Sequence, residues 1–306
     1  MIIPPPLRPG DRVALIAPSG AVLPELIMPA INAVEAMGFK VVPGRCINER
    51  IRYMSGSDEA RAQDINTMFA RKDIHGILSM RGGYGVSRIL ELLDYDMISQ
   101  NPKFFSGYSD ITTLHTVLNQ RSELITFHAP MAATEFYCGV DSYTYTMFIN
   151  AATGRFRGMF ENPQGMPIKT LHGGYCSGQL TGGNLTSIAA GMGTPYEIDT
   201  YNKILFLEDV NEPPYKIDRL LQQLRLNGKL EAAAGIVLGS FEGCGCEEEL
   251  IEIWRELLPV RKPAAYGLAV GHCMPTGSLA LGAEYMLNSE RGVLMCMERW
   301  FPQERL

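Results

Sequence analysis

The sequence predicts an α/β protein with an N-terminal parallel-sheet domain covered by helices and a second, C-terminal α/β domain. Length is the first observation, because 306 residues correspond to about two domains of roughly 150 residues each. The second is that short apolar segments alternate with segments of helical period over residues 1–120, a pattern typical of parallel sheets. The third is a composition that is 46% hydrophobic and 20% charged, which excludes disordered, collagen-like and coiled-coil chains.

The first 120 residues repeat a unit of strand, turn and helix. The predicted strands cover residues 12–17, 40–42, 76–80 and 103–107. The helices that follow them have apolar stripes made by Ile27, Ile31 and Val34, by Ala62, Ile65 and Phe69, by Ile89, Leu90 and Leu93, and by Ile111, Leu114 and Leu118. Gly38 ends the first helix, and Ser57 with two acidic residues after it begins the second. We therefore expect a parallel sheet with helices on both faces.

Three turns follow strands of this sheet. They are Pro18-Ser19-Gly20, Arg81-Gly82-Gly83-Tyr84-Gly85 and Gly107-Tyr108-Ser109-Asp110. In parallel sheets, ligands bind beyond the carboxyl ends of the strands. The three turns are the first place to expect a functional site.

The second half of the chain has its own set of predicted elements. We expect domains at residues 1–135 and 176–306, with a connector at 136–175 where glycine and proline are frequent and no period persists. Predicted strands of the second domain cover residues 203–208, 235–240, 264–270, 278–281 and 293–297. Its predicted helices have stripes made by Ile217, Leu220, Leu221 and Leu224, and by Leu250, Ile251, Trp254 and Leu257.

Charge and cysteine content restrict the partners and the compartment. The chain has 27 basic and 33 acidic residues, a net charge of −6, and it has no basic tract, so we expect no nucleic-acid partner. Seven scattered cysteines indicate reduced thiols in a cytoplasm rather than a disulfide framework. The absence of a signal-peptide pattern and of an apolar run near 18 residues predicts a soluble cytoplasmic protein without membrane contact.

Ser109 is a candidate nucleophile because of its place at a strand-to-helix turn. A hydroxyl there lies beside the free N–H groups of the next helix, which would face an oxyanion. Ile111 stands where the G-x-S-x-G motif of α/β-hydrolases has its second glycine, so that fold is disfavoured. The alternative is that Ser109 only caps the helix.

Glu208 and His272 follow strands of the second domain. Glu208 ends the apolar run 204–207, and a buried carboxylate needs a partner. That partner is either a catalytic histidine or a structural cation, Arg219 or Lys216. His272 is preferred over the other four histidines because Gly271 and a strand end precede it.

Metal and cofactor sites are disfavoured. Cys244-Gly245-Cys246 has no second pair at zinc spacing, and Cys273 as a nucleophile beside His272 is disfavoured because neighbours on a strand point apart. Gly182-Gly183-Asn184-Leu185 opens a helix but lacks the residues of a P-loop, and neither it nor residues 81–85 match the dinucleotide fingerprint. We expect no cofactor and no metal.

Taken together, these segments resemble the LD-carboxypeptidases, a serine peptidase family that includes enzymes of murein tetrapeptides and of microcin C self-immunity. The resemblance is carried by residues 13–20, 81–85, 107–112, 182–185, 205–210 and 271–272, which span nearly the whole chain in family order. The resemblance implies a flavodoxin-like or amidotransferase-like N-terminal domain and a C-terminal domain of the swivelling type. It also implies a homodimer.

The resemblance assigns a Ser-His-Glu triad across the two domains. Ser109 matches the nucleophile, His272 the general base, and Glu208 the acid that orients the histidine. Backbone N–H groups of Asp110 and of Gly82 or Gly83 match the oxyanion hole. Arg81 and Asn184 are candidates for binding the substrate carboxylate.

The implied reaction is hydrolysis of the L,D-amide between a diamino acid and the terminal D-alanine of murein tetrapeptides, through an acyl-enzyme, during peptidoglycan recycling. Two alternatives stay open: cleavage of peptidyl- or aminoacyl-adenylates, as in microcin immunity, and a non-catalytic binding protein for a small ligand. The 31 glycines, about a tenth of the chain, cluster where strands end. We interpret them as backbone that comes close to a reacting peptide.

Overall fold

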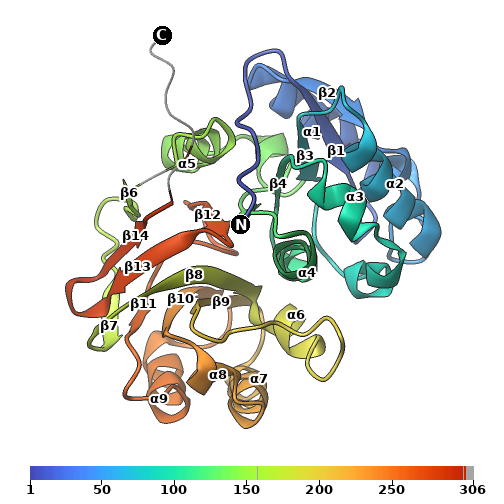
Figure 1. The fold of residues 1–306 in the computed structure, drawn as a ribbon. Helices are drawn as coiled ribbons and strands as arrows, with labels where there is room; N and C mark the ends of the chain where they lie inside the picture. The colour runs from blue at the N-terminus through green and yellow to red at the C-terminus, as the bar shows by residue number, and fades with distance from the viewer. Residues whose placement is uncertain (157, 299, 301–306) are drawn as a thin grey trace.

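Two β-sheets organise the part of the chain that the structure, a computed structural model, describes: residues 1–156, 158–298 and 300. The first sheet has six strands in the order β12-β5-β4-β3-β1-β2, and the second has eight in the order β6-β14-β13-β8-β9-β10-β11-β7. Figure 1 shows the two sheets side by side, with helix α4 beside strand β8 of the second sheet. The α/β fold class predicted from the sequence is confirmed.

Five strands of the first sheet are parallel; the parallel arrangement and four of the strands were predicted, whereas β5 was not. They are β1 (Arg12–Ile16), β2 (Lys40–Pro43), β3 (Gly76–Ser79), β4 (Phe104–Gly107) and β5 (Thr126–His128). Their alternating side chains enter two cores: Val13 and Leu15 pack under α1 (Pro24–Ala36), whereas Ala14 and Ile16 pack against α2 (Asp58–Ala70) and α4 (Thr112–Ser122). Helices therefore cover both faces of this sheet.

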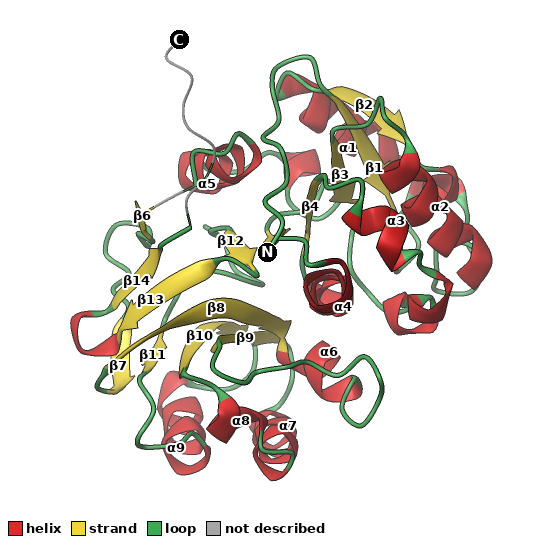
Figure 2. Ribbon diagram, in the orientation of Figure 1, coloured by secondary structure: helices red, strands yellow, loops and turns green. Residues whose placement is uncertain are grey.

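The second sheet is mixed. Its parallel centre consists of β8 (Tyr175–Asn184), β9 (Ile204–Val210), β10 (Gly235–Glu242) and β11 (Ala264–Tyr266). The antiparallel strands are β7 (Lys169–His172), β13 (Glu284–Asn288), β14 (Val293–Cys296) and β6 (Gly158–Met159). Four helices share one core with its centre: α6 (Leu185–Ala190), α7 (Pro214–Leu226), α8 (Lys229–Ala232) and α9 (Glu247–Leu257). Figure 2 shows α7, α8 and α9 together on one side of the sheet.

Three sequence-based expectations about elements are wrong. Residues 89–93 form 3₁₀ turns, and the α-helix there, α3 (Tyr95–Ser99), begins later because Asp94 caps it. Residues 136–175 contain a helix, α5 (Ser142–Ala152), capped by Asp141 and buried through Thr144 and Phe148. The strand expected at 264–270 ends at Tyr266, since Gly267 has a φ of +84°.

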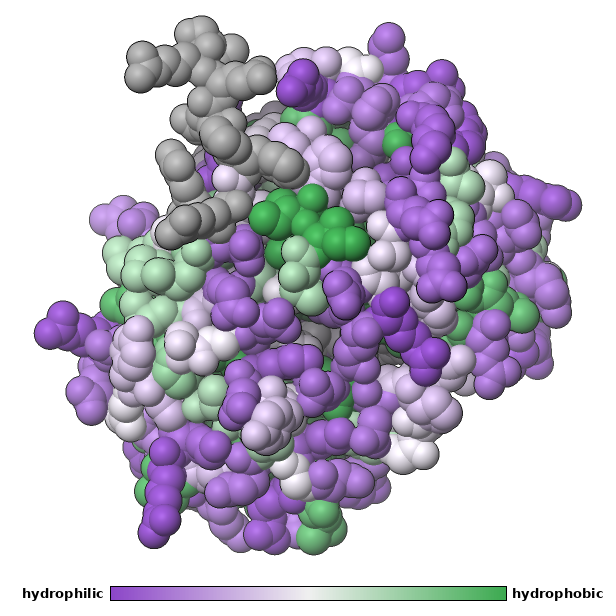
Figure 3. All heavy atoms as spheres, in the orientation of Figure 1, coloured by the Kyte–Doolittle hydropathy of each residue, from purple (hydrophilic) through white to green (hydrophobic). Residues whose placement is uncertain are grey.

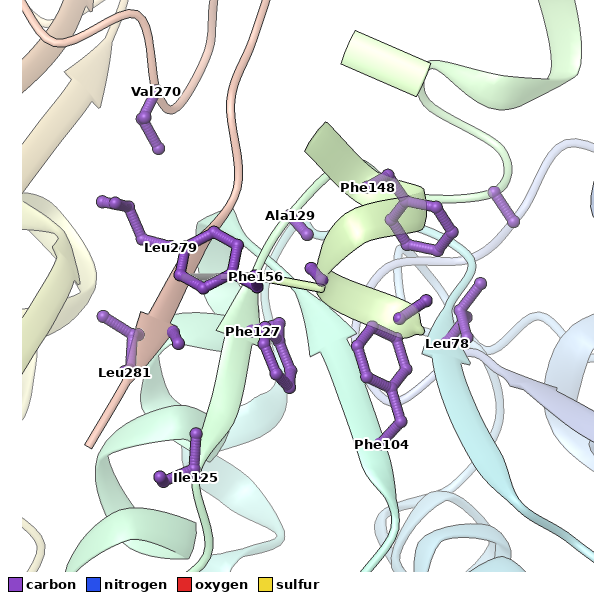
Figure 4. Close-up of a cluster of buried hydrophobic side chains, with 14 of the residues drawn as sticks. Leu78, Phe104, Ile125, Phe127, Ala129, Phe148, Phe156, Val270, Leu279 and Leu281 are labelled. Carbon is purple, nitrogen blue, oxygen red and sulfur yellow. The ribbon is translucent and has the colours of Figure 1, made fainter. Parts of the chain in front are cut away.

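The strand expected at 278–281 belongs to the first sheet rather than to the second. β12 (Leu279–Leu281) pairs antiparallel with β5. In Figure 4, Leu279 and Leu281 lie beside Phe127 of β5, whose ring centroid is 4.7 Å from that of Phe104. A segment from the end of the chain thus completes a sheet that the beginning of the chain builds.

The surface is predominantly polar on the face shown in Figure 3. Within the described residues, no helix is both long enough and apolar enough to cross a bilayer.

The position of β12 leads to a stability prediction. Leu281 has no exposed surface, so Leu281→Ala is expected to lower the free energy of unfolding by about 2–5 kcal/mol, measured by urea denaturation. Leu226→Ala, at a side chain that is 75% exposed, is the control and should change it by less than about 0.5 kcal/mol. Equal effects in the two variants would contradict the packing of β12 on the first sheet.

Candidate active site

The carboxylate of Asp110 joins the three turns at the carboxyl edge of the first sheet. Its Oδ2 accepts hydrogen bonds from Ser19 Oγ at 2.5 Å and from the Val86 N–H at 3.0 Å. The Gly20 N–H donates to the Gly82 carbonyl at 3.2 Å. Burial raises the pKa of Asp110, although these bonds oppose the rise. The turns predicted to share one edge therefore form one connected surface.

Arg61 supports the same turns and was missed by the sequence analysis. Its Nη1 donates to the Pro18 carbonyl at 2.5 Å and to the Gly85 carbonyl at 2.9 Å. The guanidinium also pairs with Asp58, which Arg88 binds from the solvent side. Arg61 is 1% exposed. Nothing in the helical pattern signals this burial, because a charged residue beside an apolar stripe usually faces solvent.

Ser109 has a strained backbone. Its φ is +65°, in the left-handed region that residues with a side chain rarely adopt. It begins the 3₁₀ turn η4 (Ser109–Ile111), which runs into α4, and the residue at the N-cap is Tyr108. The alternative reading of Ser109 as a simple helix cap is therefore wrong. Strain of this kind clusters at functional sites.

Gly82 allows the second turn to approach Ser109. A Cβ atom at Gly82 would lie 2.6 Å from Ser109 Cβ and 2.8 Å from its Oγ. The same position is 3.4 Å from the Asp110 nitrogen. Among the described residues, no acceptor bonds the backbone N–H of Gly82 or Gly83. The backbone of Gly82 thus lies against the Ser109 side chain, and its N–H is not engaged by another described residue.

Glu208 and His272, expected to meet, form a hydrogen bond. His272 Nδ1 is 2.7 Å from Glu208 Oε2, and the His272 backbone N–H donates to the same oxygen at 3.2 Å. Gly271 has a φ of +107°, and a Cβ there would lie 2.6 Å from Glu208 Oε2. The alternative cation Lys216 pairs instead with Glu212. Glu208 is fully buried, and its Oε1 has no partner among the described residues.

The carboxylates around His272 favour its charged form. Burial alone would lower its pKa, but the hydrogen bond and charge of Glu208, followed by the charges of Asp209 and Glu135, raise it above 6.5. The His272 ring also contacts the ring of Tyr108, with centroids 4.7 Å apart. Since Tyr108 precedes Ser109, this contact brings His272 to the turn of the candidate nucleophile.

Asn184 and Arg81, the two candidates for binding the substrate carboxylate, differ in the hydrogen bonds that their side chains make within the fold. Asn184 caps α6 by accepting from the Ser187 N–H, and it donates to Asp209. The Arg81 guanidinium bonds the carbonyls of Gly82 and Ala21, each at 3.3 Å. The polar atoms of Asn184 are thus occupied within the fold, whereas Arg81 lies at the turn that touches Ser109.

Tyr108 and Glu135 are further residues of this site that the sequence analysis did not single out. The Tyr108 hydroxyl donates to Glu135 Oε1 at 2.6 Å. Across the described part of the chain, no three His, Cys, Asp or Glu side chains are grouped to hold a metal ion. The site thus combines a hydroxyl on a strained turn, unpaired backbone donors and an imidazole bound to a carboxylate.

Comparison with known proteins identifies relatives over nearly the whole chain. The family model described as the LD-carboxypeptidase N-terminal domain matches residues 13–129, and the model of the C-terminal domain of the same family matches residues 177–287. A Bacillus subtilis (strain 168) protein named "Probable murein peptide carboxypeptidase" is 35% identical over 94% of this chain and 91% of its own length.

Two further similarities extend this result. "Murein tetrapeptide carboxypeptidase" of Pseudomonas aeruginosa is 30% identical over 87% of each chain. A solved structure, the "Microcin C7 self immunity protein MccF" in complex with aspartyl sulfamoyl adenosine, superimposes with a TM-score of 0.89 at 26% identity. The superposition covers 99% of this chain and 100% of that one.

The role of Arg61 can be tested by stability. Arg61→Met leaves the buried Pro18 carbonyl without a donor, whereas the Gly85 carbonyl keeps the Arg88 backbone N–H at 3.3 Å. We therefore expect the free energy of unfolding to fall by about 1–3 kcal/mol in urea denaturation. Arg88→Met removes the exposed partner of the same Asp58 and should cost at most about 1 kcal/mol. If the two variants lose equal stability, the carbonyl bonds of Arg61 contribute nothing measurable.

Proposed function

The chain belongs to the LD-carboxypeptidase family, and from this we propose that it is a serine carboxypeptidase acting through Ser109, His272 and Glu208. The observation that carries the proposal is the 2.7 Å hydrogen bond between Glu208 and His272, made beside the strained turn of Ser109. The names of the relatives support a peptidase of murein peptides. The substrate we propose is a murein tetrapeptide, cleaved between its diamino acid and the terminal D-alanine.

His272 acts in this proposal as the general base. Its Nδ1 is bound to Glu208, which leaves Nε2 to take the proton of Ser109 Oγ. As Oγ attacks the scissile carbonyl carbon, the imidazole becomes imidazolium. The buried carboxylate of Glu208 stabilises that charge and keeps the ring in the required tautomer.

Backbone donors stabilise the developing oxyanion. We assign the Asp110 N–H, in the first turn before α4, and the N–H of Gly83 or Gly82. The close approach of Gly82 to Ser109 and to the Asp110 nitrogen supports this assignment. In comparable sites, loss of one such donor lowers turnover by about 10²–10³-fold.

Collapse of the tetrahedral intermediate completes the first half of the reaction. The amide C–N bond breaks, His272 protonates the leaving D-alanine nitrogen, and an ester links the peptide to Ser109. Water, deprotonated by His272, then attacks the ester and regenerates the serine hydroxyl. We propose the Arg81 guanidinium, rather than Asn184, as the group that binds the terminal carboxylate.

A second candidate reaction is cleavage of peptidyl- or aminoacyl-adenylates. The similarity to MccF over the full length of both chains favours it. The same three residues would act, and only the leaving group would differ. The recycling role in the cytoplasm and the homodimer stay predictions, the latter to be checked by light scattering.

The nucleophile can be identified by a fluorophosphonate probe. Mass spectrometry is expected to find the adduct on Ser109 in the wild type and none in Ser109→Ala. The labelling rate should rise with pH through a pKa above 6.5, because only neutral His272 accepts the proton. His272→Ala should label far more slowly, whereas His75→Ala, at a half-exposed histidine, should label normally. An adduct elsewhere, or none, refutes the serine mechanism.

The substrate can be identified by product release. We expect D-alanine from a disaccharide tetrapeptide, with turnover lowered about 10⁶-fold in Ser109→Ala and about 10⁴-fold in Glu208→Ala. Release of aspartate from aspartyl sulfamoyl adenosine, without D-alanine from the tetrapeptide, would select the second candidate reaction. Release of neither product would support the binding-protein alternative.

A further inference from the structure

Tyr108 lies between the candidate nucleophile and a buried carboxylate. Its ring meets the imidazole of His272 edge to face, with centroids 4.7 Å apart and planes at 66°. Its hydroxyl donates to Glu135 Oε1 at 2.6 Å. Tyr108 and Glu135 are both buried, at 4% and 8% exposure. The Tyr108 side chain is therefore fixed at both ends, by its buried backbone and by the hydrogen bond of its hydroxyl.

Glu135 is fixed as firmly as Tyr108. Its Oε2 accepts from the Met131 N–H at 2.8 Å, so both carboxylate oxygens are bonded. Burial raises the pKa of Glu135, and the bonds from Tyr108 and Met131 oppose that rise. A carboxylate in this position is costly to bury unless its bonds are made, and no step of the proposed reaction uses it.

Three carboxylates and a neutral imidazole surround His272. Glu208 and Asp209 belong to β9, and Glu135 lies in the loop after β5; all three raise the pKa of His272. His128 of β5 also packs against Tyr108, with ring centroids 5.5 Å apart, and burial keeps the pKa of His128 well below 6.5. The thiol of Cys273 stays neutral because burial raises its pKa to about 11.

We propose that Tyr108 and Glu135 form a positioning pair for His272, in which the tyrosine ring sets the plane of the imidazole and the carboxylate holds the ring. The proposal rests on the proposed function. One hydrogen bond between Glu208 and Nδ1 leaves the imidazole free to rotate about the direction of that bond. The Tyr108 ring, packed against the imidazole, removes this freedom and fixes the direction of Nε2. Supports of this kind determine whether a catalytic group is within reach of its partner.

The pair links the two halves of the chain. Tyr108 and Glu135 belong to the first half, and His272 and Glu208 to the second. Glu208 orients the base within its own half, so a contact with the first half is needed to aim it at Ser109. The residue immediately before the nucleophile is well placed for this task.

The test compares three variants with a matched control. Tyr108→Phe keeps the ring and removes the hydroxyl, Tyr108→Leu removes the ring, and Glu135→Gln removes the charge. Tyr95→Phe is the control, because it also removes a tyrosine hydroxyl bonded at 2.7 Å, to the Leu90 carbonyl, away from the site. Turnover is followed as D-alanine release, and the pKa of His272 by NMR, its signal being assigned by its loss in His272→Gln.

Turnover should depend on the ring more than on the hydroxyl. In Tyr108→Leu, kcat is expected to fall about 10²-fold with KM unchanged, the size of effect that a displaced catalytic group produces. In Tyr108→Phe the fall should stay within about tenfold, equivalent to one hydrogen bond. Both Tyr108→Phe and Glu135→Gln should lower the pKa of His272, the first because Glu135 without its donor is protonated more readily. Tyr95→Phe should change neither quantity.

Two results would overturn the proposal: equal kcat in Tyr108→Leu and Tyr108→Phe, or a His272 pKa that is the same in Glu135→Gln and the wild type. If Tyr108→Leu does not fold by circular dichroism, Tyr108→Phe and Glu135→Gln still test the role of the hydroxyl and of the carboxylate, and an unchanged His272 pKa in both would overturn the proposal. Failure of the proposed function is a separate outcome, since a wild type that releases no D-alanine leaves the NMR comparison intact.

Discussion

The fully buried carboxylate of Glu208 imposes the constraint on which the site depends. Within strand β9, two residues before its end, it is removed from water, so its charge requires donors. The donors are the ring and backbone of His272, which lies 64 residues further along the chain. The chain reaches this position only because Gly271 leaves room for the carboxylate. Burial of one acid thereby fixes the place of the imidazole.

The two sheets must then be fixed relative to each other, because Ser109 follows strand β4 of the first sheet, whereas Glu208, which binds His272, lies in strand β9 of the second. Strand β12 from the end of the chain completes the first sheet, and Leu281 is buried there. On the other side of the interface, the Asn184 N–H donates to Thr112 Oγ1 at 2.9 Å. These contacts, together with the packing of the Tyr108 ring against His272, fix the position of the second half of the chain relative to the first at the site.

The sequence pattern was sufficient to predict the elements and turns whose formation depends on residues that are close together in the chain. The alternation of strands and helices predicted the parallel sheet and the shared edge of its three turns, and the position of Glu208 after an apolar run implied a partner. Contacts between distant segments could not be predicted in this way. The apolar run at Leu279 fits a strand of either sheet, and the position of Arg61 in the sequence does not predict which carbonyls it bonds. The helix after Asp141 was missed because its buried face begins with a threonine.

The strained turn explains why so many buried polar groups lie around Ser109. A positive φ at a residue with a side chain costs about 1–3 kcal/mol and persists only where neighbouring contacts leave no alternative. Asp110 binds Ser19 and the Val86 N–H, and Arg61 binds two carbonyls of the flanking turns. Relaxing Ser109 would therefore disturb three turns at once. The same bonds that stabilise this edge of the sheet also hold the turn that carries Ser109, so stability and the proposed reactivity share one set of residues.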